Sequence, residues 1–190
     1  MVRARDDHRP APRAQMVVHI VPMRRRHLRA VMRIEAETHP RPWSLSLFMS
    51  EIALRSSRAY YVARVEGVLV GYVGLMVSAD EGHITTIAVD PGWHRRTIGT
   101  RLLLTAAREA IQRGAQALTL EVRMSNRAAQ ELYRGFGFRP AGVRKNYYVE
   151  TNEDALIMWA EDVHEPAYRR RLDTIEASLP GETIVDEGRR

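Results

Sequence analysis

Cysteine is absent from the 190 residues, and so is any long apolar run. Without cysteine the chain can form neither a disulfide nor a thiolate metal site, and it has no thiol nucleophile. No apolar stretch approaches the ~18 residues that a membrane-spanning helix needs. The basic start, residues 1–15, also lacks the apolar core of a secretory signal. We therefore predict a cytoplasmic protein with no membrane partner.

The charge balance is basic, with 29 Lys and Arg against 23 Asp and Glu and a net charge of +6. A basic chain can bind nucleic acid, a ribosomal surface or an anionic cofactor. Much of the excess lies in the two ends and in "MRRRHLR", residues 23–29, and no recognised nucleic-acid motif is present. We predict no direct nucleic-acid binding. We also predict no metal site, because no helical histidine–carboxylate pair is apparent.

The spacing of apolar residues predicts an α/β chain in which helices pack on a mixed sheet. The expected order is one strand, two helices, three strands, a helix, a strand, a helix and two strands. Ser44 is the expected cap of the second helix, Glu66-Gly67 a hairpin turn, and Gly114 the left-handed end of the third helix. Residues 1–15 are expected to form a disordered basic arm and residues 16–163 a single domain. Residues 164–190 are expected to form a tail with a short helix at 167–178 and then a disordered end.

An anion site is suggested by "WHRRTIGTRLL", residues 93–103, which lies between a predicted strand and a predicted helix. The first N–H groups of a helix have no partner within it, and with the helix dipole they can hold a pyrophosphate. Gly99 lets a ligand approach the backbone, and Arg95, Arg96 and Arg101 add positive charge. An ordinary turn with solvated arginines is the simpler interpretation of this segment taken alone.

Three residues further along the chain each allow a catalytic and a structural interpretation. Strand alternation places Glu121 on the polar face of "ALTLEVR", as a general base or as a surface residue paired with Arg123 or a neighbour. Tyr133 lies on the apolar face of the next helix, as a core residue or as a phenol that protonates a leaving thiolate. Asn126, two turns earlier, is the expected N-cap of that helix.

Two further pairs of neighbouring residues have the same ambiguity. Tyr147 and Tyr148 can line the mouth of a pocket or cover the edge of a strand. Pro42 and Trp43 can form a substrate wall or a hydrophobic plug over the second helix. The residues alone do not decide between these interpretations.

Taken together, four blocks in this order resemble the GNAT superfamily of N-acetyltransferases. They are "PRPWS" (40–44), "TIAVDPGWHRRTIGTRLL" (86–103), "LTLEVRMSNRAAQELYRGFGF" (118–138) and "VRKNYYVETNEDALIMWA" (143–160). Within the superfamily they look like the RimI-type enzymes, which acetylate the N-terminal alanine of a ribosomal protein. The resemblance implies the acyl-CoA N-acyltransferase fold over residues 16–163, with acetyl-CoA as co-substrate and no metal.

The resemblance also implies roles for individual residues. Glu121 is then the base, acting through water, and Tyr133 the acid. The cofactor would be bound by the strand backbone at Ile87, Ala88 and Val89, by Asn126, and by the pyrophosphate loop: His94, Arg95, Arg96, Thr97, Ile98, Gly99 and Thr100. Pro42, Trp43, Tyr147 and Tyr148 would be the walls for a peptide N-terminus.

The pyrophosphate loop departs from the family pattern, since Thr97 replaces the first glycine and His94 the leading Gln or Arg. The Thr97 hydroxyl is expected to donate to phosphate or to cap the helix. Two rival functions stay open. One is an acetyltransferase of the same fold that acts on lysine or on a small amine. The other is a non-catalytic acetyl-CoA-binding module associated with the ribosome.

Overall fold

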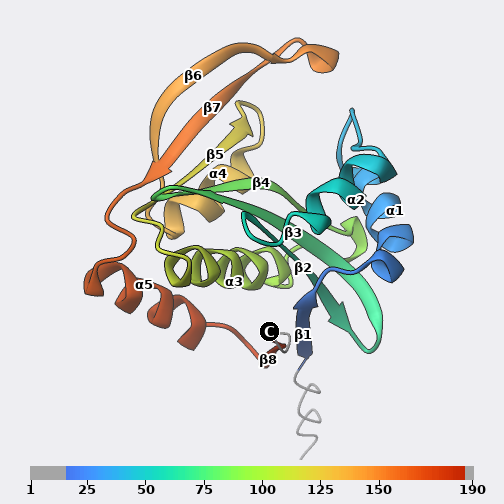
Figure 1. Ribbon diagram of the computed structural model, residues 1–190, viewed down its shortest axis with the longest axis horizontal. Coiled ribbons are helices and arrows are strands. Elements are labelled where there is room, and N and C mark those ends of the chain that lie inside the picture. Colours follow the sequence, from blue (N-terminus) through green and yellow to red (C-terminus); the bar gives the residue numbers. More distant parts are fainter. Residues whose placement is uncertain (1–15, 187–190) are drawn as a thin grey trace, which may run out of the picture.

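The computed structural model describes residues 16–186, which form one mixed sheet covered by helices on both faces (Figure 1). The expected disordered arm, residues 1–15, lies outside the described residues. The strand order is β6-β7-β5-β4-β3-β2-β1-β8, and neighbours are antiparallel except for β4–β5 and β1–β8. The strands are β1 (Val17–Pro22), β2 (Arg58–Val65), β3 (Val68–Ser78), β4 (Glu81–Val89), β5 (Ala117–Arg123), β6 (Arg139–Tyr148), β7 (Glu153–Ala160) and β8 (Glu182–Val185).

The helices divide between two apolar cores, one on each face of the sheet. The larger core contains side chains of α3 (Ile98–Gln112), α4 (Arg127–Gly135) and α5 (Pro166–Ala177). The smaller core contains side chains of α1 (Leu28–Thr38) and α2 (Leu45–Ala53). Successive residues of β2 alternate between the two cores, as the pleat of a strand requires. Short 3₁₀ turns η1 (Arg25–His27), η2 (Pro91–Trp93) and η3 (Val149–Thr151) complete the chain.

Local signals in the sequence explain most element boundaries. The Ser44 hydroxyl accepts from the Leu47 N–H at the start of α2. The β2–β3 hairpin turns at Glu66-Gly67, whose φ angles of +48° and +84° suit a two-residue turn of the I′ type. Gly114, with φ +92°, follows α3 as its left-handed terminator. The predicted caps and hairpin are confirmed.

Strands β4 and β5 pair over only three residues each and then diverge (Figure 1). Pairing ends at His83 and Thr119, although β4 continues to Val89 and β5 to Arg123. The register between β3 and β4 shifts at this point and leaves Thr85 as an extra residue. Such a bulge bends a strand away from its neighbour. We call the parts of β4 and β5 that do not pair with each other, residues 84–89 and 120–123, the β4–β5 fork.

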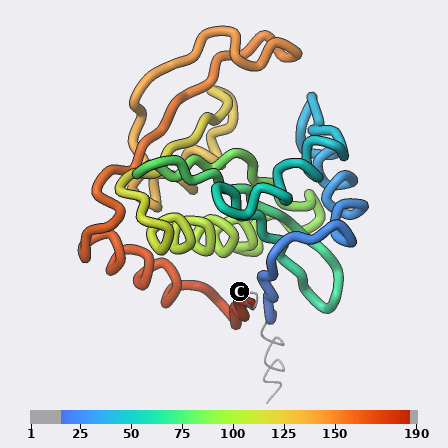
Figure 2. The backbone as a smooth tube through the Cα atoms, viewed as in Figure 1, coloured from blue at the N-terminus to red at the C-terminus, as the bar shows by residue number. Residues whose placement is uncertain are grey.

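The chain after residue 163 packs against the domain along α3 and ends beside β1 (Figure 2). Helix α5 occupies the stretch where a short helix was expected, and it buries Tyr168 and Leu172 in the larger core. The expectation of a disordered end is wrong for residues 182–185, which form β8 and pair in parallel with β1. The side chains of these four residues do not alternate clearly between polar and apolar. They form a strand because they pair with the edge of β1, which their own sequence does not indicate.

No helix within residues 16–186 is long and apolar enough to cross a membrane.

Candidate active site

The edge of β4 at the β4–β5 fork presents backbone groups that β5 does not use. The Asp90 N–H donates to the Val70 carbonyl of β3 at 2.9 Å. Because backbone groups of successive residues point to opposite sides of a strand, those of Ile87 and Val89 face the fork. Those of Ala88 face β3 instead, opposite Tyr72. Of the three predicted backbone contacts, two are therefore directed toward the fork.

The loop before α3 adopts an unusual backbone. Arg95 and Thr97 both have φ +61°, which is uncommon for residues other than glycine. Thr97 is the residue before α3, but its hydroxyl does not cap the helix and donates to the Arg96 carbonyl at 2.7 Å. The first N–H groups of the helix, from Ile98 to Thr100, thus have no side-chain cap from Thr97. These N–H groups can donate hydrogen bonds to a phosphate oxygen.

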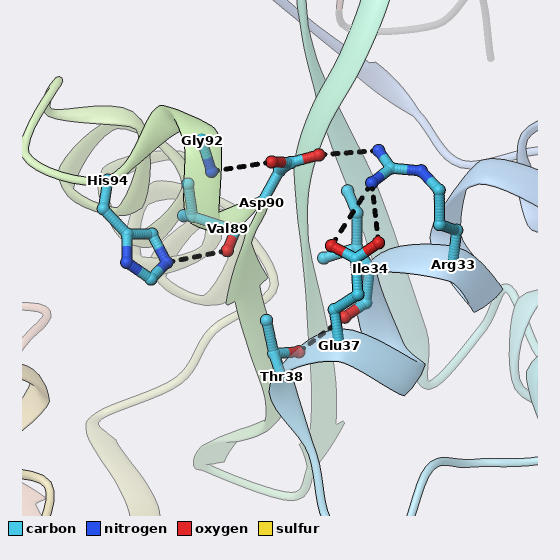
Figure 3. Close-up of polar contacts among 8 residues, drawn as sticks. All are labelled: Arg33, Ile34, Glu37, Thr38, Val89, Asp90, Gly92 and His94. Carbon is cyan, nitrogen blue, oxygen red and sulfur yellow. Dashed lines mark hydrogen bonds and ion pairs between the residues drawn. The ribbon is translucent and has the colours of Figure 1, made fainter.

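Polar contacts fix the end of β4 beside this loop (Figure 3). A ring nitrogen of His94, Nε2, lies 2.9 Å from the Val89 carbonyl oxygen. Asp90 accepts from the Gly92 N–H at 2.9 Å and pairs with Arg33 of α1 at 2.6 Å. The Arg33 guanidinium is the main reason that the pKa of Asp90 lies below its ordinary value. Helix α1 therefore braces the start of the predicted pyrophosphate loop.

Arg101 is not available to a phosphate, contrary to its predicted contribution of charge to the loop. Its side chain is 1% exposed. Nε donates to the Thr97 hydroxyl at 3.3 Å, and the two Nη atoms donate to the Thr183 hydroxyl and the Pro180 carbonyl. These contacts point Arg101 toward the C-terminal part of the chain.

Glu121 lies on the polar face of β5, as its strand position predicted, and is held by two basic side chains. One carboxylate oxygen lies 3.2 Å from Nε2 of His83 on β4, and the other 3.4 Å from Nη2 of Arg144 on β6. The hydrogen bond from His83 is the main reason that the pKa of Glu121 is lowered, against the opposing effect of burial. Arg123, one of the expected structural partners, stacks on Tyr148, 4.4 Å from the ring centroid, so the neighbours that Glu121 contacts are His83 and Arg144.

Tyr133 projects from α4 into the larger core and is 5% exposed. Burial raises the pKa of its phenol, and the nearby Tyr148 raises it further. Within residues 16–186 the Tyr133 hydroxyl has no hydrogen-bonding side chain, yet it is not among the fully buried unpaired polar atoms. A protonated phenol with a free donor is the state that a general acid requires.

Tyr148, at the end of β6, is a third titratable residue of this region. Burial raises the pKa of its phenol to about 12, with smaller effects from Arg123, Tyr147 and Glu121. Arg144 of β6 joins Glu121 to the tyrosine pair, because its guanidinium lies 3.4 Å from the Glu121 carboxylate and 5.6 Å from the centroid of the Tyr147 ring, which packs against Tyr148. Tyr133 of α4 is buried beside this group, and Tyr148 contributes to its raised pKa.

The other predicted walls come from two segments that meet across the site. Trp43, in the loop between α1 and α2, packs on Phe48 with ring centroids 5.2 Å apart, and its neighbour Pro42 is exposed. Tyr147 is 47% exposed and packs edge-on against Tyr148 at 5.1 Å. An ion pair of 3.0 Å between Arg41 and Glu150 joins the α1–α2 loop to the β6–β7 connection.

Asn126 caps α4 as predicted, because its side-chain oxygen accepts from the Ala129 N–H at 3.1 Å. The amide nitrogen of Asn126 forms no hydrogen bond with a side chain or backbone group of residues 16–186. The residue can therefore cap the helix and donate to a ligand at the same time.

Sequence reasoning missed the buried carboxylate of Glu35, which is 1% exposed. It accepts from the Trp43 N–H at 2.9 Å and from the Tyr72 hydroxyl, and it lies 3.1 Å from Nδ1 of His39. Glu35 and His39 are a histidine–carboxylate pair four residues apart, which the sequence analysis overlooked. The sequence offered one signal for this buried carboxylate, because Glu35 lies within an apolar helix face that is followed by a loop. No group of three metal-ligating side chains occurs within residues 16–186.

A cavity of about 1360 Å³ lies away from this cluster, beside α3 and the β1–β2 pair. Arginines dominate its polar lining, and of the residues predicted for catalysis, the cofactor or the acceptor only Arg101 contributes to it. We therefore place the candidate site at the β4–β5 fork, where the titratable groups and free backbone donors converge.

Comparison with known proteins agrees with this arrangement. The model of the acetyltransferase (GNAT) family matches residues 28–138. A putative [ribosomal protein bS18]-alanine N-acetyltransferase of Bacillus subtilis is 39% identical over 137 residues, which cover 72% of this chain and 91% of the relative. The [ribosomal protein bS18]-alanine N-acetyltransferase of Escherichia coli K12 is 38% identical over 133 residues, 69% and 88% of the two chains.

A solved structure extends the match to three dimensions. The crystal structure of the ribosomal-protein-S18-alanine N-acetyltransferase from Escherichia coli superposes with a TM-score of 0.70 at 35% identity, covering 76% of this chain and 94% of that one. Family model, curated relatives and fold agree, and this chain belongs to the acetyltransferase (GNAT) family.

Proposed function

We propose that this protein transfers the acetyl group of acetyl-CoA to the N-terminal α-amine of a protein, and that its substrate is a ribosomal protein that begins with alanine. One observation carries the proposal: β4 and β5 stop pairing after three residues, and Glu121 lies at the resulting fork, held by His83 of β4 and Arg144 of β6. The names of the relatives, which are ribosomal-protein alanine N-acetyltransferases, support the substrate.

The cofactor would lie along the free edge of β4 with its pyrophosphate at the start of α3. Backbone N–H groups of Ile87 and Val89 would pair with the pantetheine arm. The loop from His94 to Thr100 would hold the pyrophosphate on backbone donors, with Arg95 and Arg96 adding positive charge. Asn126 would donate its free amide hydrogens to the cofactor.

Glu121 would accept the proton of the attacking amine. The α-amine of a peptide has a pKa of about 8, so a modest base delivers it in the neutral form. The lowered pKa of Glu121 keeps the carboxylate ionised, and this supports transfer through a water rather than by a strongly basic side chain. The amine nitrogen then bonds to the thioester carbonyl carbon, and the carbon–sulfur bond breaks.

Tyr133 would donate its phenolic proton to the departing thiolate. The raised pKa keeps the phenol protonated until the thiolate forms. Acid–base assistance of this kind is typically worth about 10²–10⁴-fold in rate, and alignment of amine and thioester contributes more. Pro42, Trp43, Tyr147 and Tyr148 would enclose the peptide N-terminus that this alignment requires.

Mass spectrometry of peptides incubated with the protein and acetyl-CoA tests the function. The set contains free N-termini that begin with Ala, Ser, Gly and Met, and N-blocked peptides that carry lysine. We expect acetylation of free N-termini only, strongest for alanine. Acetylation of the blocked lysine peptides would instead assign a lysine acetyltransferase. Binding of acetyl-CoA without transfer to any peptide would support a non-catalytic module.

A further inference from the structure

Thr97 occupies a backbone conformation that a β-branched residue avoids. Its φ of +61° and ψ of +10° lie in the left-handed region, where the Cβ atom crowds the following carbonyl group. The family pattern has a glycine here, and glycine adopts this conformation without such a penalty. A contact from outside the loop is needed to hold threonine in place.

Arg101 supplies that contact from one turn further along α3. Its Nε donates to the Thr97 hydroxyl at 3.3 Å, and the same hydroxyl donates to the Arg96 carbonyl at 2.7 Å. The hydroxyl is therefore fixed on both sides. Every donor nitrogen of the guanidinium is used within the chain, since the two Nη atoms donate to Pro180 and Thr183.

The guanidinium has no carboxylate partner within residues 16–186, although it is 1% exposed. Burying a charge without a counter-charge is unfavourable unless its hydrogen bonds are satisfied. Two of its three hydrogen bonds, those of the Nη atoms, have acceptors in the C-terminal segment, residues 164–186. The segment therefore determines where the Arg101 side chain lies.

The C-terminal segment is itself anchored independently of Arg101. Strand β8 pairs with β1 over four residues, and the Asp186 N–H donates to the Ile20 carbonyl at 2.8 Å. Tyr168 and Leu172 of α5 are buried in the larger core. Gly181, at φ +75°, passes so close to Met16 that a Cβ there would meet the Met16 carbonyl oxygen at 2.3 Å.

We infer that the C-terminal segment positions the pyrophosphate loop through Arg101, which holds Thr97 in its left-handed conformation. Arg101 is then a positioning residue that does not touch the cofactor. The inference rests on the proposed function only for the identity of the ligand at this loop. It assigns a role in cofactor affinity to a part of the chain beyond the family match, which ends at residue 138.

Calorimetric titration of the full chain with CoA tests the inference without a peptide substrate. Arg101→Met removes the three hydrogen bonds and should weaken CoA binding about tenfold, a coupling of the usual size between connected sites. Thr183→Val, a milder change outside the loop, should weaken it in the same direction by a smaller factor. In acetyl transfer, KM for acetyl-CoA should rise while kcat and KM for the peptide stay unchanged.

Arg108→Met is the matched control. Arg108 lies seven residues further along α3 and pairs with Asp173 and Glu176 of α5, so its loss also loosens the contact between α3 and the C-terminal segment. It lies about 10 Å further along the helix than Arg101. CoA affinity of Arg108→Met should equal that of the unmodified chain.

The same titrations in chains that also carry Thr97→Gly test the role of Thr97. Once Thr97→Gly is present, Arg101→Met should have no further effect on CoA affinity, because glycine needs no support in this conformation. Equal affinities of the unmodified chain, Arg101→Met and Thr183→Val would overturn the inference. So would equal losses in Arg101→Met and Arg108→Met, or an undiminished effect of Arg101→Met in the glycine background. Failure of the unmodified chain to bind CoA would instead refute the proposed function.

Discussion

Glu35 should make the largest contribution of any single polar side chain to the stability of the α1–α2 region. Glu35→Ala removes the carboxylate that accepts from the Trp43 N–H and the Tyr72 hydroxyl and that pairs with His39. Tyr72 is fully buried, so its hydroxyl cannot turn to solvent for a replacement. The substitution therefore leaves two donors without their acceptor.

The magnitude follows from that count. Each buried donor left without a partner costs about 1–3 kcal/mol. With both donors affected, we expect Glu35→Ala to lower the free energy of unfolding by roughly 2–6 kcal/mol, twice the cost of one such donor. KM for the peptide should also rise, because the Trp43 backbone loses its tether, while CoA affinity should change little.

Urea unfolding followed by circular dichroism measures the loss, with Glu37→Ala as the control on the same helix. Glu37 is 45% exposed and pairs with Arg33 four residues before it, so its removal should cost under about 0.5 kcal/mol. If Glu35→Ala were within about 1 kcal/mol of Glu37→Ala, the reasoning about buried unsatisfied donors would be refuted.

Three further predictions concern other groups. The Tyr168 hydroxyl is buried without a partner within residues 16–186; Tyr168→Phe should leave thermal stability unchanged or raise it by about 1 kcal/mol, and a clear loss would reveal a missed contact. Asn126→Ala should cost about 1 kcal/mol in unfolding because α4 loses its cap, whereas Asn126→Asp should retain stability and raise KM for acetyl-CoA; equal stability of all three chains would contradict the cap. His83→Ala should raise the pKa of Glu121 toward its ordinary value, since His83 is the largest cause of its depression. The stabilisation from the His83–Glu121 contact is present at pH values above the pKa of Glu121 in the unfolded chain. It is lost as the pH falls through the lowered pKa of Glu121 in the folded chain. The acid limb of the kcat/KM profile should therefore move to higher pH in His83→Ala, and an unmoved limb would argue against Glu121 as the titrating group.

Features set by nearby residues were predicted from the sequence. The N-caps at Ser44 and Asn126 and the turn at Glu66-Gly67 depend on residues at most three positions away. The face of β5 that carries Glu121 follows from alternation alone. The resemblance added what local rules do not contain, namely the prediction that Glu121 and Tyr133 act in one site.

Features set by distant residues were not predicted. Strand β8 is stable because β1 offers an unpaired edge, and the sequence of residues 182–185 does not reveal that edge. Arg101 was read as a phosphate ligand because its neighbours are basic, but its partners lie about 80 residues away, at Pro180 and Thr183. His83 lies 38 positions before Glu121 and meets it only because β4 and β5 pair just before they diverge.

The central claim is that acetyl transfer occurs at the β4–β5 fork with Tyr133 as the acid. Single-turnover transfer from acetyl-CoA to a peptide beginning with alanine tests it most directly, for the unmodified chain and for Tyr133→Phe, with CoA affinity measured on both. The account predicts that Tyr133→Phe transfers the acetyl group about 10²-fold more slowly and binds CoA equally well. Transfer at the unmodified rate by Tyr133→Phe would contradict it.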